Sequence, residues 1–225
     1  TTSNVLKLAS TGSLVQTGTG ADNINVDTTA LFSSNSAVIK LGAGNDTLAL
    51  TAGNSSEYVY GEAGDDLIYV AGGTTSTDLI DGGEGSDTLA FASGTTNALI
   101  AKSIENVKVK TATGASTTAN FTSIDSSVAI ADSGVGAVTF GNLLKGSTYT
   151  STVAKEATTG DITLNFKSGE AATINVDLQK GTKGDITLTN VADATVTLGA
   201  ASTVATGISL DKTATKLTVN ATGDA

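Results

Sequence analysis

The chain has 225 residues and a formal net charge of −10, and it contains no Cys, Pro, Met, Trp or His. All 12 basic residues are Lys, so no zinc–histidine site, thiol nucleophile or histidine-based triad can form within it. We therefore predict that the chain is not an enzyme. We also expect no nucleic-acid binding, because a polyanion lacks the basic face that phosphates require. No apolar run of about 18 residues occurs, so we predict no transmembrane segment.

The composition favours thin, repetitive β-layers. Aromatic residues make up 4 % of the chain, while 26 glycines are available for tight turns. The negative charge is concentrated at one end, because residues 1–90 contain 11 acidic side chains and only two lysines, Lys7 and Lys40. An acidic segment of this kind suits a hard divalent cation that prefers oxygen ligands.

Four segments of the first half, residues 17–25, 41–49, 61–69 and 82–90, are versions of the nonapeptide G-G-x-G-x-D-x-U-x, where U is a large aliphatic residue. This repeat is typical of a calcium-binding turn followed by a short strand, and its copies stack into a parallel β-roll. A second aliphatic residue lies nine residues before each U. The resulting pairs are Val15 with Ile24, Ile39 with Leu48, Val59 with Ile68, and Ile80 with Leu89. One turn therefore holds two nonamers, and we predict that the four loops stack on one side.

The loops supply the oxygen ligands that calcium requires. An ion takes six to eight oxygens at about 2.3–2.6 Å, which one loop cannot provide but two loops stacked about 4.8 Å apart can. We predict about three Ca²⁺ ions in one column, between Asp22 and Asp46, Asp46 and Asp66, and Asp66 and Asp87. Backbone carbonyls of loop positions one to four are expected to complete the shells. These carbonyls belong to Thr17, Gly18, Thr19, Gly20, Leu41, Gly42, Ala43, Gly44, Gly61, Glu62, Ala63, Gly64, Gly82, Gly83, Glu84 and Gly85.

Two further expectations follow from these loops. Position five, occupied by Asn45 or Asp65, is expected to face solvent. Without metal the four Asp residues form a column of like charges, so we expect calcium binding and folding of residues 13–92 to be coupled. The alternative interpretation is that the same glycines form a series of β-turns that bind no metal.

The rest of the chain carries no metal loop. We predict a short helical turn over residues 97–103 and a strand over residues 104–110. Strand-like segments then recur about every 22 residues in two interleaved series. One series begins at Ile162, Ile186 and Ile208, and the other at Ile174, Val196 and Leu217. These series predict a parallel β-solenoid or a repetitive β-sandwich.

We therefore divide the chain into a calcium β-roll, residues 1–92, and a β-repeat structural domain, residues 93–225. The chain has no initiator Met and ends within a repeat, so we expect it to be part of a longer protein. Tyr58, Tyr60 and Tyr69 lie near the third loop. They could form a stacking platform for a sugar or a partner chain, but edge packing on a thin solenoid is the favoured interpretation.

Residues 13–92 resemble the repeats-in-toxin (RTX) calcium β-roll, because all four copies have Gly at position four and Asp at position six. Thr17, Leu41 and Glu62 depart from the pattern, so the sites at these loops are expected to be weaker or differently coordinated. The β-roll followed by residues 103–111 and further β-repeats is similar to the self-assembling surface-layer (S-layer) proteins of Gram-negative bacteria.

This second resemblance implies a structural protein that is exported by type I secretion and assembles with itself on the cell surface in the presence of calcium. It also implies cell-surface polysaccharide as a partner, through regions outside this chain. Two alternatives remain open, a stalk segment of a type I-secreted adhesin and the calcium-folding tail of a secreted enzyme. The active site of such an enzyme would lie elsewhere, because neither H-E-x-x-H nor G-x-S-x-G occurs here.

Overall fold

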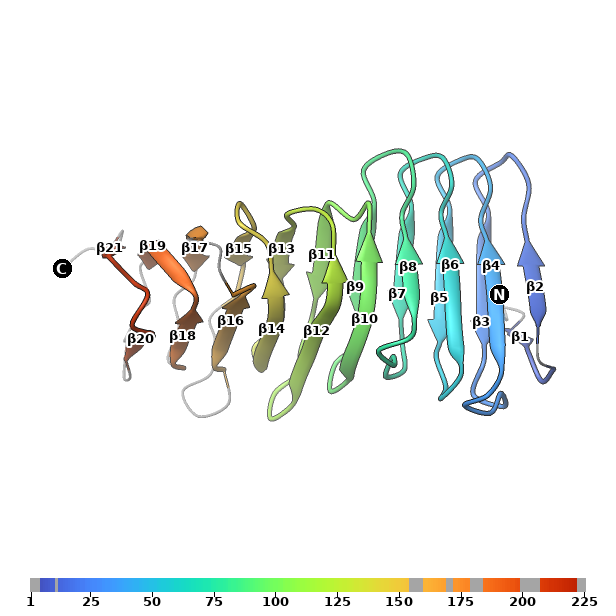
Figure 1. The fold of residues 1–225 in the computed structure, drawn as a ribbon, viewed down its shortest axis with the longest axis horizontal. Coiled ribbons are helices and arrows are strands. Elements are labelled where there is room, and N and C mark those ends of the chain that lie inside the picture. The colour runs from blue at the N-terminus through green and yellow to red at the C-terminus, as the bar shows by residue number, and fades with distance from the viewer. Residues whose placement is uncertain are drawn as a thin grey trace.

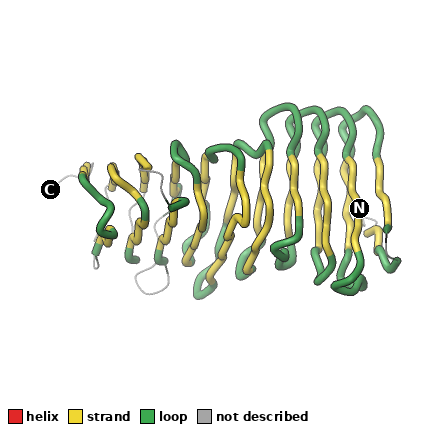
Figure 2. The backbone as a smooth tube through the Cα atoms, in the orientation of Figure 1, coloured by secondary structure: helices red, strands yellow, loops and turns green. Residues whose placement is uncertain are grey.

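The computed structural model describes residues 5–10, 12–153, 160–168, 172–178, 184–198 and 207–221. Over these ranges the chain consists of strands and loops without a helix (Figure 2), and it winds into an elongated parallel β-solenoid (Figure 1). Successive strands alternate between two parallel sheets, so each turn contributes one strand to each sheet. The predicted all-β class is confirmed, and the second half is a solenoid.

The odd-numbered strands form one sheet. They are β1 (Val5–Lys7), β3 (Asn23–Asp27), β5 (Thr47–Thr51), β7 (Leu67–Val70), β9 (Thr88–Phe91), β11 (Asn106–Val109), β13 (Ala129–Asp132), β15 (Thr148–Ser151), β17 (Ala172–Leu178), β19 (Val191–Leu198) and β21 (Lys216–Ala221). The even-numbered strands form the other. They are β2 (Ser13–Gln16), β4 (Ser36–Lys40), β6 (Ser56–Tyr60), β8 (Leu79–Asp81), β10 (Thr96–Lys102), β12 (Ser116–Ile124), β14 (Ala137–Leu143), β16 (Ile162–Phe166), β18 (Ile186–Thr189) and β20 (Ile208–Leu210).

The aliphatic positions of the repeats stack in register. In the odd sheet Ile24 is paired with Leu48, Leu48 with Ile68, and Ile68 with Leu89. The aliphatic residues nine positions earlier form the equivalent ladder in the even sheet, from Val15 to Ile80. Alternate residues of each strand point into the narrow space between the sheets, because side chains alternate across a strand. The predicted pairing of two nonamers per turn is therefore confirmed.

Two details of the second half differ from the prediction. Residues 97–103 do not form a helical turn, because residues 96–102 are strand β10, whose pairing with β8 and β12 overrides the local propensity. The expected strand at residues 104–110 is present as β11. In the odd sheet, Val196 pairs with Val176 and Val219, not with Ile174 and Leu217. The register is therefore two residues away from the predicted one, because the paired residues lie 20 and 23 positions apart and not at an even spacing of about 22.

Both sheets continue across residue 92. Strand β9 pairs with β11, and β8 pairs with β10, so the ladders run from the acidic repeats into the later turns without interruption. The buried side chains change along this path. The acidic repeats are filled mainly by Val, Ile and Leu, whereas the later turns also bury large aromatic residues among their aliphatic side chains. The fully buried aromatic side chains there are Phe121, Phe140, Tyr149 and Phe166.

Within the described ranges, nothing forms a helix with the length and apolar character needed to cross a membrane.

Candidate metal centre

The four acidic loops have the same length and lie on the same edge. Each loop contains six residues and connects an even strand to the following odd strand: residues 17–22, 41–46, 61–66 and 82–87. Figure 1 shows them as a row of tall arches along the upper right edge of the solenoid. The predicted stacking on one side is confirmed. The next loop on this edge has only three residues, 103–105.

Carboxylates and backbone amides connect these loops. The Asp22 N–H donates to Asp46 Oδ1 at 2.7 Å, and the Asp46 N–H donates to Asp66 Oδ1 at 2.8 Å. The Asp66 N–H donates to Asp87 Oδ1 at 2.8 Å, and the Asp87 N–H donates to Glu105 Oε2 at 2.9 Å. Each carboxylate therefore uses one oxygen to hold the preceding loop in register.

Glu105 is the residue of this ladder that the sequence prediction missed. It stands in the shortened loop and lacks the glycines of the nonapeptide, so the pattern does not include it. A weaker signal was available. Asp87 precedes the aliphatic Leu89 by two residues, and Glu105 precedes Val107 by two residues. Leu89 and Val107 are paired in the odd sheet, so the acid-x-aliphatic spacing marks the equivalent position.

Three aspartates of the column have a second oxygen without a partner. Asp46, Asp66 and Asp87 are 2 %, 2 % and 0 % exposed, and the Oδ2 atom of each is buried without a hydrogen-bond donor in the described structure. Burial raises the pKa of Asp66 to about 6, and the charges of Asp87 and Asp46 add to this effect. Burial likewise raises the pKa of Asp87. A buried carboxylate with an unsatisfied oxygen is costly unless a cation or a proton satisfies it.

Glycine is required where neighbouring loops come closest. Gly44, Gly64 and Gly85 at position four have φ angles of +125°, +131° and +137°. A Cβ atom on Gly64 would lie 2.0 Å from the Gly44 carbonyl oxygen. Position one is equally crowded in the later loops. A Cβ atom on Gly61 would lie 2.1 Å from the Gly82 carbonyl oxygen and 2.4 Å from Asp66 Oδ2. A carbonyl and an unpartnered carboxylate oxygen therefore face the same small space.

The middle positions of the loops form their own backbone ladder. The N–H groups of Ala43, Ala63 and Glu84 donate to the carbonyls of Gly18, Gly42 and Glu62, at 3.0, 3.0 and 2.7 Å. The N–H groups of Gly44 and Gly64 donate to the carbonyls of Ala63 and Glu84, both at 2.8 Å. Each of these carbonyls retains a second lone pair. Carbonyls predicted as ligands at positions two and three are thus held in place by hydrogen bonds between loops.

The first loop differs from the others. The Thr17 hydroxyl donates to the Leu41 carbonyl, and the Gly18 N–H donates to Asp22 Oδ2 at 3.3 Å. Thr19 and Gly20 are exposed, and Asp22 is only partly buried. Leu41, which replaces the glycine of position one, is fully buried in the core.

Position five faces solvent, as predicted. Asn45 and Asp65 are exposed. They still connect the loops, because the Asp65 N–H donates to Asn45 Oδ1 at 3.0 Å and the Ser86 N–H donates to Asp65 Oδ1 at 2.8 Å. This outer ladder has no buried unpartnered oxygen.

The donor set of the inner ladder fits a hard cation. No group of three or more acidic side chains converges on one point in the described part of the chain, so each site would combine carboxylates of successive loops with backbone carbonyls. Such an all-oxygen set of carboxylates and carbonyls is the set that Ca²⁺ prefers, and it lacks the nitrogen and sulfur ligands typical of zinc.

A fourth unpartnered oxygen lies on the opposite edge. Glu57 is 1 % exposed and its Oε2 atom has no hydrogen-bond partner in the described structure. Its Oε1 atom accepts a hydrogen bond from the Ser55 hydroxyl, and its N–H donates to Asp78 Oδ1 at 3.0 Å. Burial, together with the charge of nearby Asp78, raises the pKa of Glu57 to about 7. The other carboxylate oxygens of Glu57 and Asp78 already accept hydrogen bonds. The free oxygen of Glu57 therefore suits a proton better than a metal ion that needs several ligands.

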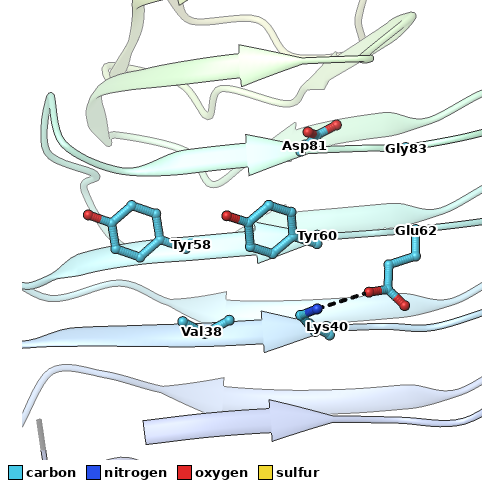
Figure 3. Close-up of a pocket in the computed structure, with 7 residues that line it drawn as sticks. All are labelled: Val38, Lys40, Tyr58, Tyr60, Glu62, Asp81 and Gly83. Atoms are coloured by element: carbon cyan, nitrogen blue, oxygen red, sulfur yellow. Dashed lines mark ion pairs between the residues drawn. The ribbon is translucent and has the colours of Figure 1, made fainter. Parts of the chain in front are cut away.

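The tyrosines do not form one cluster. Tyr58 and Tyr60 lie side by side on the outer face of β6, in a shallow groove of about 530 Å³ (Figure 3). Lys40 lies at this groove, with Nζ 3.5 Å from a carboxylate oxygen of Glu62 and 5.9 Å from the centre of the Tyr60 ring. Tyr69 belongs to β7 in the other sheet, where it is 39 % exposed.

Comparisons with known protein families, with curated proteins and with solved structures found no match to this chain.

Proposed function

We propose that this chain is a calcium-dependent structural protein of a self-assembling bacterial surface layer, in which Ca²⁺ folds and stiffens the region of residues 1–92. The observation that carries the calcium site is the column of three buried carboxylate oxygens without hydrogen-bond donors, on Asp46, Asp66 and Asp87. Ions between successive loops would supply the missing partners.

The charge distribution supports the same interpretation. The first 90 residues carry nine more acidic than basic side chains. Stacking the loops brings the aspartates of successive turns together, so that the N–H of one donates to the carboxylate of the next. About three Ca²⁺ ions would offset most of this charge, and their binding free energy would contribute directly to folding.

A structural role accounts for the rest of the molecule. The two sheets form one continuous rod, and the chain lacks the His and Cys side chains on which many catalytic sites depend. We therefore propose that the chain has no catalytic activity. Secretion by the type I route, location on the cell surface and association with other copies of the chain belong to the same proposal, through the resemblance of its repeats to S-layer proteins.

Calcium titration of the chain tests the metal site. We expect calorimetry and native mass spectrometry to detect about three bound ions, and far-UV circular dichroism to gain β-structure on calcium addition. Asp66→Asn should weaken binding at least tenfold, because it removes the charge of an inner carboxylate. Asp65→Asn is the matched control, since it changes the same charge at an exposed position where the preceding loop already has Asn45. Equal affinities for the two variants would refute the inner column as the site.

Assembly is tested separately, at high protein concentration with calcium and with chelator. An S-layer component should form calcium-dependent sheets visible by electron microscopy and large particles in light scattering. A chain that binds calcium but remains a monomeric rod would favour the adhesin stalk, for which the same continuous solenoid would serve as a spacer.

A further inference from the structure

We propose that Glu105 completes a calcium site with Asp87, so that the metal column lies one turn further toward the C-terminus than the nonapeptides predict. The proposed sites are Asp46/Asp66, Asp66/Asp87 and Asp87/Glu105, and the Asp22/Asp46 pair holds no ion. This inference rests on the calcium binding proposed above, and it assigns a ligand that stands outside the G-x-G-x-D pattern.

The backbone register places Glu105 at the sixth position of a shortened loop. Asn106 pairs with Thr88 and Val107 pairs with Leu89, so Glu105 follows Asp87 in the column. At the start of the same loop, Lys102 pairs with Asp81, which makes Ser103 the equivalent of Gly82. The Asp87 N–H donates to Glu105 Oε2 at 2.9 Å, as the Asp66 N–H donates to Asp87 Oδ1 at 2.8 Å.

The oxygen atoms around Asp87 repeat those around Asp66. A Cβ atom on Gly82 would lie 2.2 Å from the Ser103 carbonyl oxygen and 2.5 Å from Asp87 Oδ2. The equivalent distances at Gly61 are 2.1 Å to the Gly82 carbonyl oxygen and 2.4 Å to Asp66 Oδ2. Asp87 is fully buried, and its Oδ2 atom has no hydrogen-bond donor among the described residues. An equivalent carbonyl oxygen and carboxylate oxygen therefore lie beside Gly61 and beside Gly82.

The Asp22/Asp46 pair lacks this arrangement. The two oxygens that would face an ion there are Asp22 Oδ2 and the Leu41 carbonyl. The Gly18 N–H donates to the first at 3.3 Å, and the Thr17 hydroxyl donates to the second. Each of these two oxygens thus already has a hydrogen-bond donor, whereas Oδ2 of Asp66 and of Asp87 has none in the described structure.

The Asp87/Glu105 site would connect the acidic loops to the turns that follow. Glu105 directly precedes β11, and β11 pairs with both β9 and β13. An ion at this position would hold the last acidic loop against the first turn without the nonapeptide. Calcium would then order the junction between the two regions as well as the acidic loops themselves.

Calcium binding by the full chain and three variants tests this site, with calorimetry for affinity and native mass spectrometry for the number of ions. Glu105→Gln keeps an oxygen acceptor for the Asp87 N–H but removes the charge. We expect it to bind one ion fewer, or to bind one ion at least tenfold more weakly. Asp65→Asn is the matched control, because it makes the same acid-to-amide change on an exposed residue of an acidic loop that is not a predicted ligand. Asp22→Asn should bind as many ions as the unaltered chain.

Hydrogen exchange on the unaltered chain gives a second readout that does not depend on any variant. Calcium should slow exchange of the amides of Asp87 and of residues 103–106. The site is refuted if Glu105→Gln retains all ions with unchanged affinities, if Asp22→Asn loses an ion instead, or if saturating calcium leaves exchange at residues 103–106 unchanged. An unaltered chain that binds no calcium would refute the proposed function itself, which separates the two failures.

Discussion

Two buried aspartates, one in each half of the solenoid, are stabilised in different ways. Asp132 is fully buried, and protein groups satisfy both of its oxygens, because Oδ1 accepts the Gly134 N–H at 2.8 Å and Oδ2 accepts the Tyr149 hydroxyl at 2.5 Å. Asp66 is almost equally buried, but only its Oδ1 has a donor. Among the described residues, the buried carboxylate oxygens without a partner all lie in the acidic turns, on Asp46, Glu57, Asp66 and Asp87.

The buried hydrophobic side chains of the two regions also differ. The later turns bury Phe121, Phe140, Tyr149 and Phe166, and an aromatic residue buries more apolar area than the aliphatic residues that mostly fill the acidic turns. The same two-sheet architecture thus contains buried carboxylate oxygens without donors in the acidic turns and a buried Asp132 with two donors in the later turns.

Removal of calcium should have the largest effect. At a calcium concentration of 100 Kd, each site stabilises the folded state by about 2.7 kcal/mol, so three sites would contribute roughly 8 kcal/mol. We expect hydrogen exchange in chelator to be fast over residues 13–92 and to remain slow over β12–β15. Uniform loss of protection along the chain would show that the two regions are not separable.

Gly64→Ala should be the most damaging small substitution in the acidic loops. Its Cβ atom would meet the Gly44 carbonyl oxygen at 2.0 Å, and its φ angle of +131° is unfavourable for any residue with a side chain. We expect a loss of about 3 kcal/mol in the free energy of unfolding, together with weaker calcium binding. Gly20→Ala is the control, because no described atom lies within 4 Å of its Cβ position. Equal losses for both variants in chemical denaturation would contradict the stacked-loop geometry.

Tyr149→Phe tests the later turns. It leaves Asp132 Oδ2 without the hydroxyl donor in a fully buried position, so we expect destabilisation by about 2 kcal/mol. Thermal or denaturant unfolding of these turns should show the same decrease in the free energy of unfolding in calcium and in chelator. A decrease in stability seen only in calcium, or only in chelator, would mean that Asp132 is coupled to the candidate metal column.

Glu57→Gln concerns the unpartnered carboxyl on the opposite edge of the acidic turns. The pKa of Glu57 is about 7 in the folded protein, above its ordinary value of 4.5. The folded state therefore binds the proton more tightly than the unfolded state, and stability decreases as the pH rises through about 7. At saturating calcium, the Gln variant should be more stable than the unaltered chain by about 2 kcal/mol at pH 8.5, with little difference at pH 4.5. An identical pH dependence of the melting temperature for both proteins would refute this account of Glu57.

The repeat pattern predicted the acidic turns closely. The spacing of Ile24, Leu48, Ile68 and Leu89 gave both the strand pairing and the one-sided stacking of the loops. It did so because glycines at fixed positions and one aliphatic residue per strand repeat at almost constant separation. The later turns lack such markers, and there the prediction placed Val196 two residues out of register and assigned β10 to a helical turn.

The sequence by itself determined the fold class, the position of the acidic loops and the oxygen-rich character of the candidate site, because these follow from local turn chemistry repeated along the chain. Only the tertiary structure decided which oxygens lack a donor, since that depends on contacts between residues about 20 positions apart. Asp22 and Asp87 occupy the same position of the nonapeptide, yet a backbone amide satisfies Oδ2 of Asp22, whereas Oδ2 of Asp87 is buried without a donor beside Glu105.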